Sequence, residues 1–112
     1  NAALRRLYIE IARHIRGENA GGSVAKKIVH LDGANWRGNN FIASGLDAIR
    51  AHDAAAADES LNAFFAAHAK RKRSKQITDT VSPLGTFMIN LAAHQNVRVN
   101  LRPEFSIYYV KL

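Results

Sequence analysis

The sequence contains no cysteine, only two prolines and a single tryptophan among its 112 residues. Without cysteine the chain forms neither a disulfide nor a thiolate metal site, which argues against a structural zinc centre. The absence also fits a reducing compartment, so we expect an intracellular protein. No apolar run approaches the ~20 residues of a membrane-spanning helix, and no signal peptide is visible.

Acidic residues are also scarce. Nine Asp and Glu face 16 Lys and Arg, which gives a formal net charge of +7 and a pI of about 10.3. Such an excess favours a polyanionic partner, nucleic acid first and an anionic membrane surface second. The alternative is a basic protein without a specific partner.

The length of 112 residues suits one domain over residues 1–112 with a modest core. We see no internal repeat and no linker that would divide the chain. Because it begins at Asn1 rather than at a methionine, we expect a processed product or part of a longer protein.

Apolar spacing and capping residues predict four helices. An amphipathic helix is expected over 2–16, ended by Gly17, and a second over 40–52. Asp58 is expected to cap a third helix, which runs into the basic segment 70–75. Ser82 and Pro83 form a typical start for a fourth, which Asn96 closes in the left-handed conformation.

Between these helices, β-branched residues predict strands. We expect strands over 25–31 and 76–78, an alternating strand from Val97 to Leu101, and another from Phe105 to Leu112. For the last of these the alternative is a helix that starts at Pro103. The alternation of helices and strands predicts an α/β fold: a small three-layer sandwich with a partly parallel sheet and an N-terminal amphipathic helix.

The strongest functional signal is the run KRKRSK. Its five cations, Lys70, Arg71, Lys72, Arg73 and Lys75, are candidates for phosphate contacts, because each neutralised phosphate releases counterions. Two alternatives stay open: a solvated helix end whose charge complements the helix dipole, and a localisation signal. Trp36 and Arg37 suit base stacking and hydrogen bonding, although a lone tryptophan also fits ordinary packing.

Two of the few acids follow predicted strands. Asp32 ends the strand 25–31 and Asp79 ends the strand 76–78. In open α/β sheets ligands bind beyond the carboxyl ends of strands, so these two carboxylates are candidate Mg²⁺ ligands and catalytic residues that activate water against a phosphodiester. The alternative is that Asp32 starts a turn at Gly33 and Asp79 caps the following helix.

The segments VHLDGANW and QITDTVSPLGTFMINLAAHQNVRVNL resemble two motifs of the NYN domains, which are PIN-like nucleases. In that family an apolar strand ends in an aspartate followed by Gly and Asn, and a later strand also ends in an acid. The resemblance implies a metal-dependent ribonuclease with Asp32 and Asp79 as metal ligands and Asn35 as a residue that orients the site.

A second resemblance concerns the tail, HQNVRVNLRPEFSIYYVKL, which is similar to the C-terminal helical part of UbiB-type atypical kinases. No kinase catalytic motif accompanies it. It implies that Phe105–Leu112 is helical and that the fold is not α/β.

The leading prediction is therefore a basic domain that binds nucleic acid, with RNA as the expected form, and that is related to PIN-like nucleases. The first alternative is a Mg²⁺-dependent ribonuclease that uses Asp32 and Asp79. The second is a non-catalytic subunit of a larger complex, with a protein partner or as a homo-oligomer.

Overall fold

The computed structural model describes residues 2–18, 22–29, 36–71 and 80–112, and their regular elements are all helical. In chain order these are α1 (Ala2–Ile15), α2 (Val24–Val29), α3 (Arg37–Arg50), α4 (Ala54–Lys70), α6 (Pro83–His94) and the 3-10 helix η1 (Pro103–Tyr108). Helix accounts for 74% of this part of the chain, which contains no strand. The predicted α/β sandwich with a partly parallel sheet is therefore wrong, and the fold is helical.

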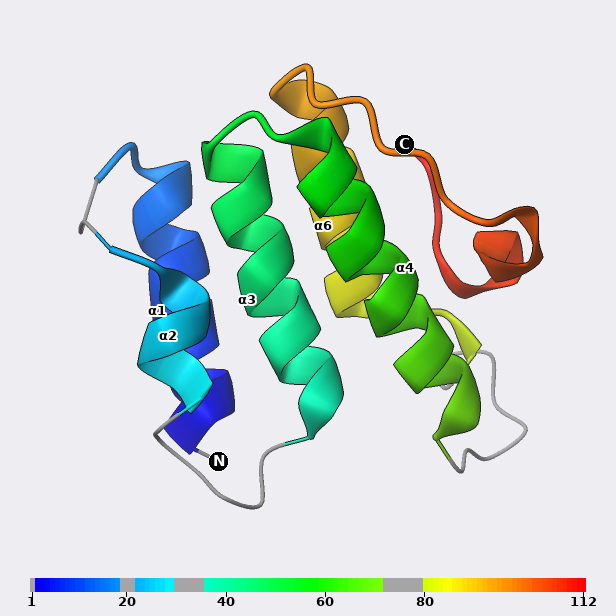
Figure 1. The fold of residues 1–112 in the computed structure, drawn as a ribbon, viewed down its shortest axis with the longest axis horizontal. Helices are drawn as coiled ribbons and strands as arrows, with labels where there is room; N and C mark the ends of the chain where they lie inside the picture. The colour runs from blue at the N-terminus through cyan, green and yellow to red at the C-terminus, as the bar shows by residue number, and fades with distance from the viewer. Residues whose placement is uncertain (1, 19–21, 30–35, 72–79) are drawn as a thin grey trace.

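Helix α3 is central to the packing. It contacts α1, α2, α4 and α6, while η1 packs on α4 (Figure 1). The chain reverses direction between α3 and α4 over residues 51–53, so these two helices lie side by side and antiparallel (Figure 1). The start of α3 is thereby placed near the end of α4, where the functional candidates are found.

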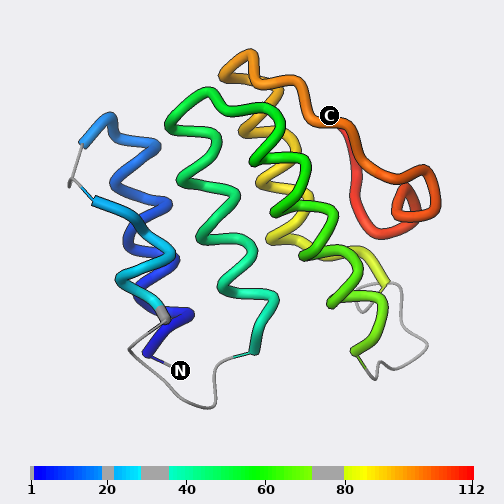
Figure 2. Tube along the Cα trace, in the orientation of Figure 1, coloured from blue at the N-terminus to red at the C-terminus, as the bar shows by residue number. Residues whose placement is uncertain are grey.

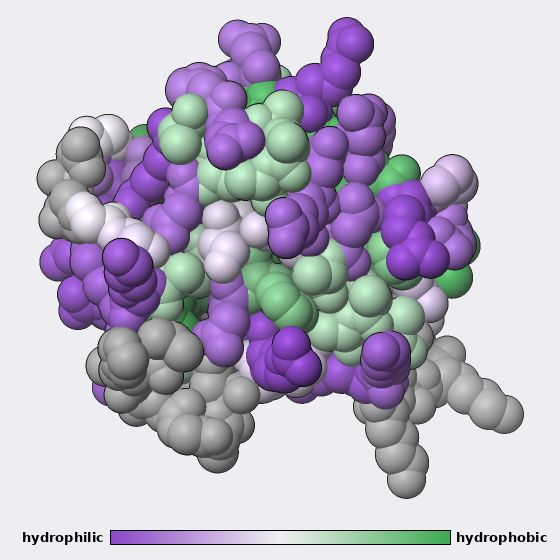
Figure 3. All heavy atoms as spheres, viewed as in Figure 1, coloured by the Kyte–Doolittle hydropathy of each residue, from purple (hydrophilic) through white to green (hydrophobic). Residues whose placement is uncertain are grey.

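The core is built from apolar residues at helical spacing. In α3, Ile42, Leu46 and Ile49 are fully buried, and in α4 the buried stripe includes Phe64 and Phe65. Outside this core the viewed face carries mostly hydrophilic residues, with smaller apolar areas between them (Figure 3). No helix in the described ranges combines the length and apolar character needed to cross a membrane.

Several predicted helix ends are confirmed. Gly17 and Asn96 take positive φ angles of 75° and 61° where α1 and α6 end. Ser82 caps α6, because its hydroxyl accepts a hydrogen bond of 2.9 Å from the backbone N–H of Gly85, and Pro83 opens the helix. The cap of α4 differs from the prediction, because Asp53, and not Asp58, accepts the backbone N–H of Ala56 at 3.1 Å.

The predicted strand over 25–31 is wrong where the structure describes it, because Val24–Val29 is helix α2. A carboxylate from another helix stabilises its start. Asp47 of α3 accepts hydrogen bonds from the backbone N–H groups of Val24 at 2.8 Å and Ala25 at 3.1 Å, and from the hydroxyl of Ser23 at 2.7 Å. This carboxylate satisfies N–H groups that a short helix leaves unpaired at its start.

The predicted strands at the C-terminus are also wrong. Residues 97–102 are extended but pair with no other strand in the described chain, and Pro103–Tyr108 is the 3-10 helix η1. Pro103 starts this helix, which suits its fixed φ angle. The trace then turns back beside its own path (Figure 2).

Candidate nucleic-acid interface

Two of the predicted nucleic-acid-binding segments meet in the structure. Trp36 immediately precedes α3, and Arg71 immediately follows α4. Because these helices are antiparallel, the guanidinium carbon of Arg71 lies 3.9 Å from the centre of the Trp36 ring. Residues 35 positions apart in the sequence thus form one cation–π pair.

The indole of Trp36 is held in place by packing on two sides. It meets the ring of Phe64 edge to face, with ring centres 5.7 Å apart. It also folds over the first turn of α3, where a Cβ atom added to Gly38 would lie only 2.3 Å from the indole. The indole is therefore half-buried by packing, and Arg71 lies over its ring.

Three cations lie at this end of the α3–α4 pair. Arg37, Lys70 and Arg71 are all exposed, and none of them forms an ion pair within the described residues. The guanidinium of Arg37 lies 5.7 Å from the ring centre of Phe41. The structure thus brings together four of the predicted site residues at one end of the α3–α4 pair.

The electrostatics at the start of α3 are unusual for a helix. Its first turn contains no acidic residue and begins with Arg37, and the side chain of Trp36 makes no capping hydrogen bond. A cation at a helix N-terminus opposes the helix dipole, which favours negative charge there. The positive charge of Arg37 adds to the positive end of the helix dipole, and both favour negative charge near the start of α3.

Several cations in α1, in α2 and just after α1 differ from these three, because they form ion pairs with glutamate side chains. Glu10 is fully buried and pairs with Lys27 at 2.9 Å and with Arg13 at 3.1 Å. Arg16 pairs with Glu18 at 3.0 Å. The pair of Glu10 with Lys27 connects α1 to α2, and the pair of Arg16 with Glu18 lies just after α1. These paired cations do not add to the unpaired basic residues at the end of the α3–α4 pair.

The remaining predicted site residues lie outside the described parts of the chain. They are Asp32, Lys72, Arg73, Lys75 and Asp79, together with Asn35. The structural argument that placed Asp32 at a sheet edge no longer applies, because the segment before it is helix α2. Within the described ranges, no group of three or more His, Asp or Glu side chains is arranged to hold a metal ion.

Comparisons with family models, curated proteins and solved structures give no match to this chain. The resemblance to NYN domains and the resemblance to the UbiB tail therefore both stay predictions. The helical architecture agrees with the non-α/β fold that the second resemblance implies, but the helix it implies over Phe105–Leu112 is present only as far as Tyr108, because Tyr109 is extended. The function has to be argued from the geometry itself.

Proposed function

We propose that this domain binds nucleic acid, with RNA as the expected form, at the end of the α3–α4 pair. The contacting residues are Trp36, Arg37, Lys70 and Arg71. The observation that carries the proposal is the stack of Arg71 on Trp36, because it unites a base-stacking side chain with the start of the basic segment.

The chemistry of this arrangement suits a single-stranded ligand. A guanidinium that lies over an aromatic ring still has N–H donors in its plane, and these can contact a phosphate in bidentate fashion. An aromatic ring beside cations is the usual combination in sites that hold single-stranded nucleic acid, where bases stack and phosphates follow the basic groove. The net charge of +7 adds long-range attraction for any polyanion.

The single tryptophan of the chain gives a direct test, because its fluorescence reports on the proposed interface alone. Oligouridylate and oligothymidylate of equal length are titrated against the protein at several salt concentrations. A base that takes the place of Arg71 on the indole is expected to quench the fluorescence of Trp36. For a single strand, the slope of log K against log salt is expected to fall by about 0.7 for each phosphate contact removed.

Replacement of Arg37, Lys70 and Arg71 by glutamine is expected to lower the slope by about two units if each cation holds one phosphate. The matched control removes three exposed cations elsewhere that also have no ion pair within the described chain. These are Arg5, Lys26 and Arg98. Equal losses of affinity and slope in the two triple variants would show that overall charge, and not this end of the molecule, drives binding.

Magnesium-dependent cleavage through Asp32 and Asp79 stays a separate prediction of the sequence. It has a different test from the present proposal, because the proposal is tested by binding alone, whereas this prediction is tested by cleavage of RNA. The assembly-subunit alternative also stays a prediction.

A further inference from the structure

Three described residues pack around the indole of Trp36, and Arg71 is the exposed one among them. A Cβ atom added to Gly38 would lie 2.3–2.5 Å from three consecutive atoms of the indole, so buried Gly38 lies directly against the ring. Phe64, which is also buried, meets the ring edge to face. The guanidinium carbon of Arg71 lies over the ring, 3.9 Å from its centre. The surface of the indole that a ligand reaches is therefore the surface under Arg71.

The contact between Arg71 and the indole depends on stacking alone. Arg71 follows the last residue of α4 with φ −66° and ψ 137°, so its backbone is extended. The backbone N–H of Arg71 donates to the carbonyl of His68 at 3.2 Å, which fixes the backbone. The guanidinium, by contrast, forms no hydrogen bond and no ion pair within the described residues. Rotation of the side chain therefore removes it from the ring without breaking a hydrogen bond or an ion pair in that part of the chain.

Arg37 shows that a cation at this end of the molecule does not have to cover the indole. It follows Trp36 directly in the sequence and is exposed. Its guanidinium nevertheless lies near another ring, 5.7 Å from the ring centre of Phe41. Arg37 therefore contributes positive charge beside the site, whereas Arg71 contributes positive charge and also covers the indole.

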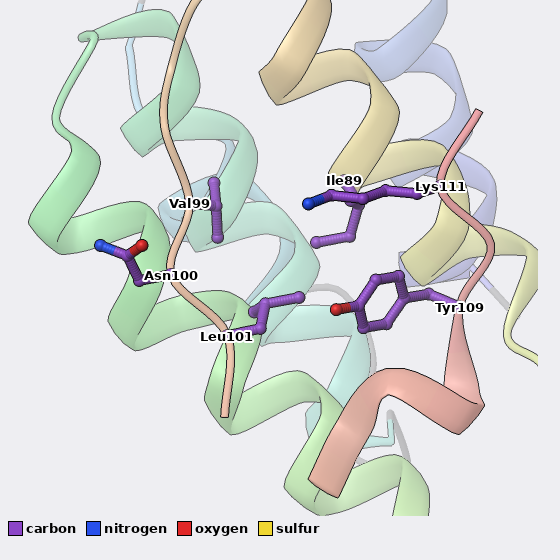
Figure 4. A pocket seen from close by; sticks show the side chains of 6 residues that line it. All are labelled: Ile89, Val99, Asn100, Leu101, Tyr109 and Lys111. Atoms are coloured by element: carbon purple, nitrogen blue, oxygen red, sulfur yellow. The ribbon is translucent and has the colours of Figure 1, made fainter. Parts of the chain in front are cut away.

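A second aromatic ring, that of Tyr109, lies beside a cavity of about 240 Å³, but it offers no open face to a base. Figure 4 shows that the side chains of Leu101, Tyr109 and Lys111 themselves fill this space. Ile89 beneath them is only 5% exposed. The ring of Tyr109 also packs against Phe65, with ring centres 5.3 Å apart. This ring is therefore part of the packing of the C-terminal segment, unlike the indole under Arg71.

Two competing interactions decide what occupies the indole. A cation–π contact at an exposed site favours the covered state about two- to fivefold. Stacking of a nucleobase on an aromatic side chain strengthens binding about 5- to 150-fold. A base is therefore able to displace the guanidinium. The apparent affinity for the base is nevertheless reduced in proportion to the fraction of molecules in which Arg71 covers the ring.

We propose that Arg71 closes the site in the free protein and that a nucleobase enters by exchange with it. The base stacks on Trp36 in place of the guanidinium, and the released Arg71 pairs with the phosphate next to that base. This inference rests on the proposed function and specifies its ligand, an unpaired base with an adjoining phosphate. A duplex offers phosphates, but its bases are already stacked and paired, so it leaves Arg71 on the indole.

The covered state is tested first without nucleic acid. Because Trp36 is the single tryptophan, quenching of the protein fluorescence by acrylamide, which is uncharged, measures access to its indole. Arg71→Ala is expected to raise the quenching constant at least about 1.5-fold, because the covering contact is lost. The matched control Arg37→Ala removes an exposed cation that lies near Phe41, and it is expected to leave the constant unchanged. Equal constants in wild type and Arg71→Ala would overturn the proposal.

The exchange itself is tested by the ratio of two affinities. Oligothymidylate and an abasic strand of equal length carry the same phosphates, but only the first carries bases. The anisotropy of a fluorescent label on each strand gives its affinity for the whole chain. Arg71→Ala removes the same phosphate contact from both strands, so the ratio isolates the effect on base stacking. This ratio is expected to rise about threefold or more in Arg71→Ala, because the base no longer competes with the guanidinium.

The variant Trp36→Leu removes the stacking ring and keeps every charge of the chain. Leucine retains part of the apolar contact with Phe64, and circular dichroism checks that the helices are intact. The ratio of the two affinities is expected to fall toward one in this variant, while the affinity for the abasic strand stays close to that of wild type. A ratio equal to that of wild type would show that the base does not stack on Trp36, and it would overturn the proposal.

The other outcomes for Arg71→Ala separate this inference from the proposed function. A lower ratio than in wild type would mean that the base stacks on the outer face of the guanidinium, and an unchanged ratio would mean that Arg71 does not control access to the indole. Either result, with both strands still bound, would refute the exchange alone. If the wild-type protein bound neither strand, the proposed function would fail and the exchange with it.

Discussion

The replacement Lys27→Met tests the ion pairs that connect α1 with α2. Glu10 is fully buried, and its two carboxylate oxygens have different donors: Lys27 at 2.9 Å and Arg13 at 3.1 Å. Methionine keeps most of the apolar stem of the lysine but removes its charge. The variant therefore leaves one buried oxygen of Glu10 without its donor while the other stays paired.

The expected cost follows from this half-satisfied state. A buried acceptor that loses its partner destabilises a protein by about 1–3 kcal/mol. Loss of the whole partner of a buried charge costs about 3–5 kcal/mol, and the remaining Arg13 keeps the cost below that range. The control is Lys26→Met, one residue earlier in α2. Lys26 is exposed and has no ion pair in the described chain, so its replacement is expected to stay within about 0.5 kcal/mol.

The difference between wild type and Lys27→Met is also expected to depend on pH. Burial raises the pKa of Glu10, but the hydrogen bond and charge of Lys27 act against it. Together with the charges of Arg13 and Arg6, they hold the pKa of Glu10 below its ordinary value of 4.5. A depressed folded-state pKa gives stability that is fully present above the unfolded value and is lost as pH falls through the folded value.

Urea unfolding of wild type and both variants, followed by circular dichroism at pH 7 and at several lower pH values, measures these differences. The free-energy gap between wild type and Lys27→Met is expected to be full at pH 7 and to shrink below about pH 4.5. A gap that stays constant down to about pH 3 would show that packing of the lysine stem, and not the ion pair, is responsible. A gap equal to that of the Lys26→Met control would show that Glu10 does not depend on Lys27.

Three further variants test the packing of two core glycines and the contribution of His14. Gly85→Ala would place a methyl group 2.7 Å from the ring of Phe65, and it is expected to lower the free energy of unfolding by about 1–3 kcal/mol. In Gly45→Ala the nearest atom to the new methyl group is the end of the Leu61 side chain, at 3.2 Å. This variant is expected to leave the urea midpoint nearly unchanged. Burial above all lowers the pKa of His14 below 6.5, so the unfolded chain takes up this proton first and stability falls as the pH drops below 6.5. His14→Gln is expected to flatten that fall in unfolding curves measured from pH 7 to 5, and an unchanged fall would mean that His14 is not responsible.

The sequence predicts α1 and α6 well because their signals are local. The prediction of a helix over 2–16 agrees with Ala2–Ile15, since Gly17 ends it with a positive φ angle that glycine adopts easily. Ser82 before α6 and Pro83 at its first position likewise mark its start. In each case the residues that determine the helix end lie within one turn of it.

The sequence predicts a strand in place of helix α2 because the residue that stabilises the start of this helix is distant in the chain. The segment VAKKIV is rich in β-branched residues, and six residues are too few for helical periodicity to be visible. Asp47, more than twenty positions later, supplies the carboxylate that caps it. The packing of α2 on α3 brings Asp47 to the start of α2. The local residue pattern of α2 does not predict this contact.

The sequence contains a signal for the contact between Trp36 and Arg71. Both residues are predicted to bind nucleic acid, but the residue pattern of neither segment predicts that they lie side by side. The two predicted helices between them, one over 40–52 and one capped by Asp58, are joined by only a few residues, which favours an antiparallel pair. Such a pair places the residue before its first helix beside the residue after its second.

The tail shows what an alternating pattern does and does not determine. Val97, Val99 and Leu101 alternate with exposed residues, and the backbone there is extended, as the pattern requires. The alternating pattern predicts which side chains are buried, but it does not predict which groups form hydrogen bonds with the backbone. Here the carboxamides of Asn62 and Asn90 take the place of neighbouring strands. Because these carboxamides pair with alternate residues only, the backbone groups of Val99, Leu101, Tyr109 and Lys111 have no hydrogen-bond partner within the described chain.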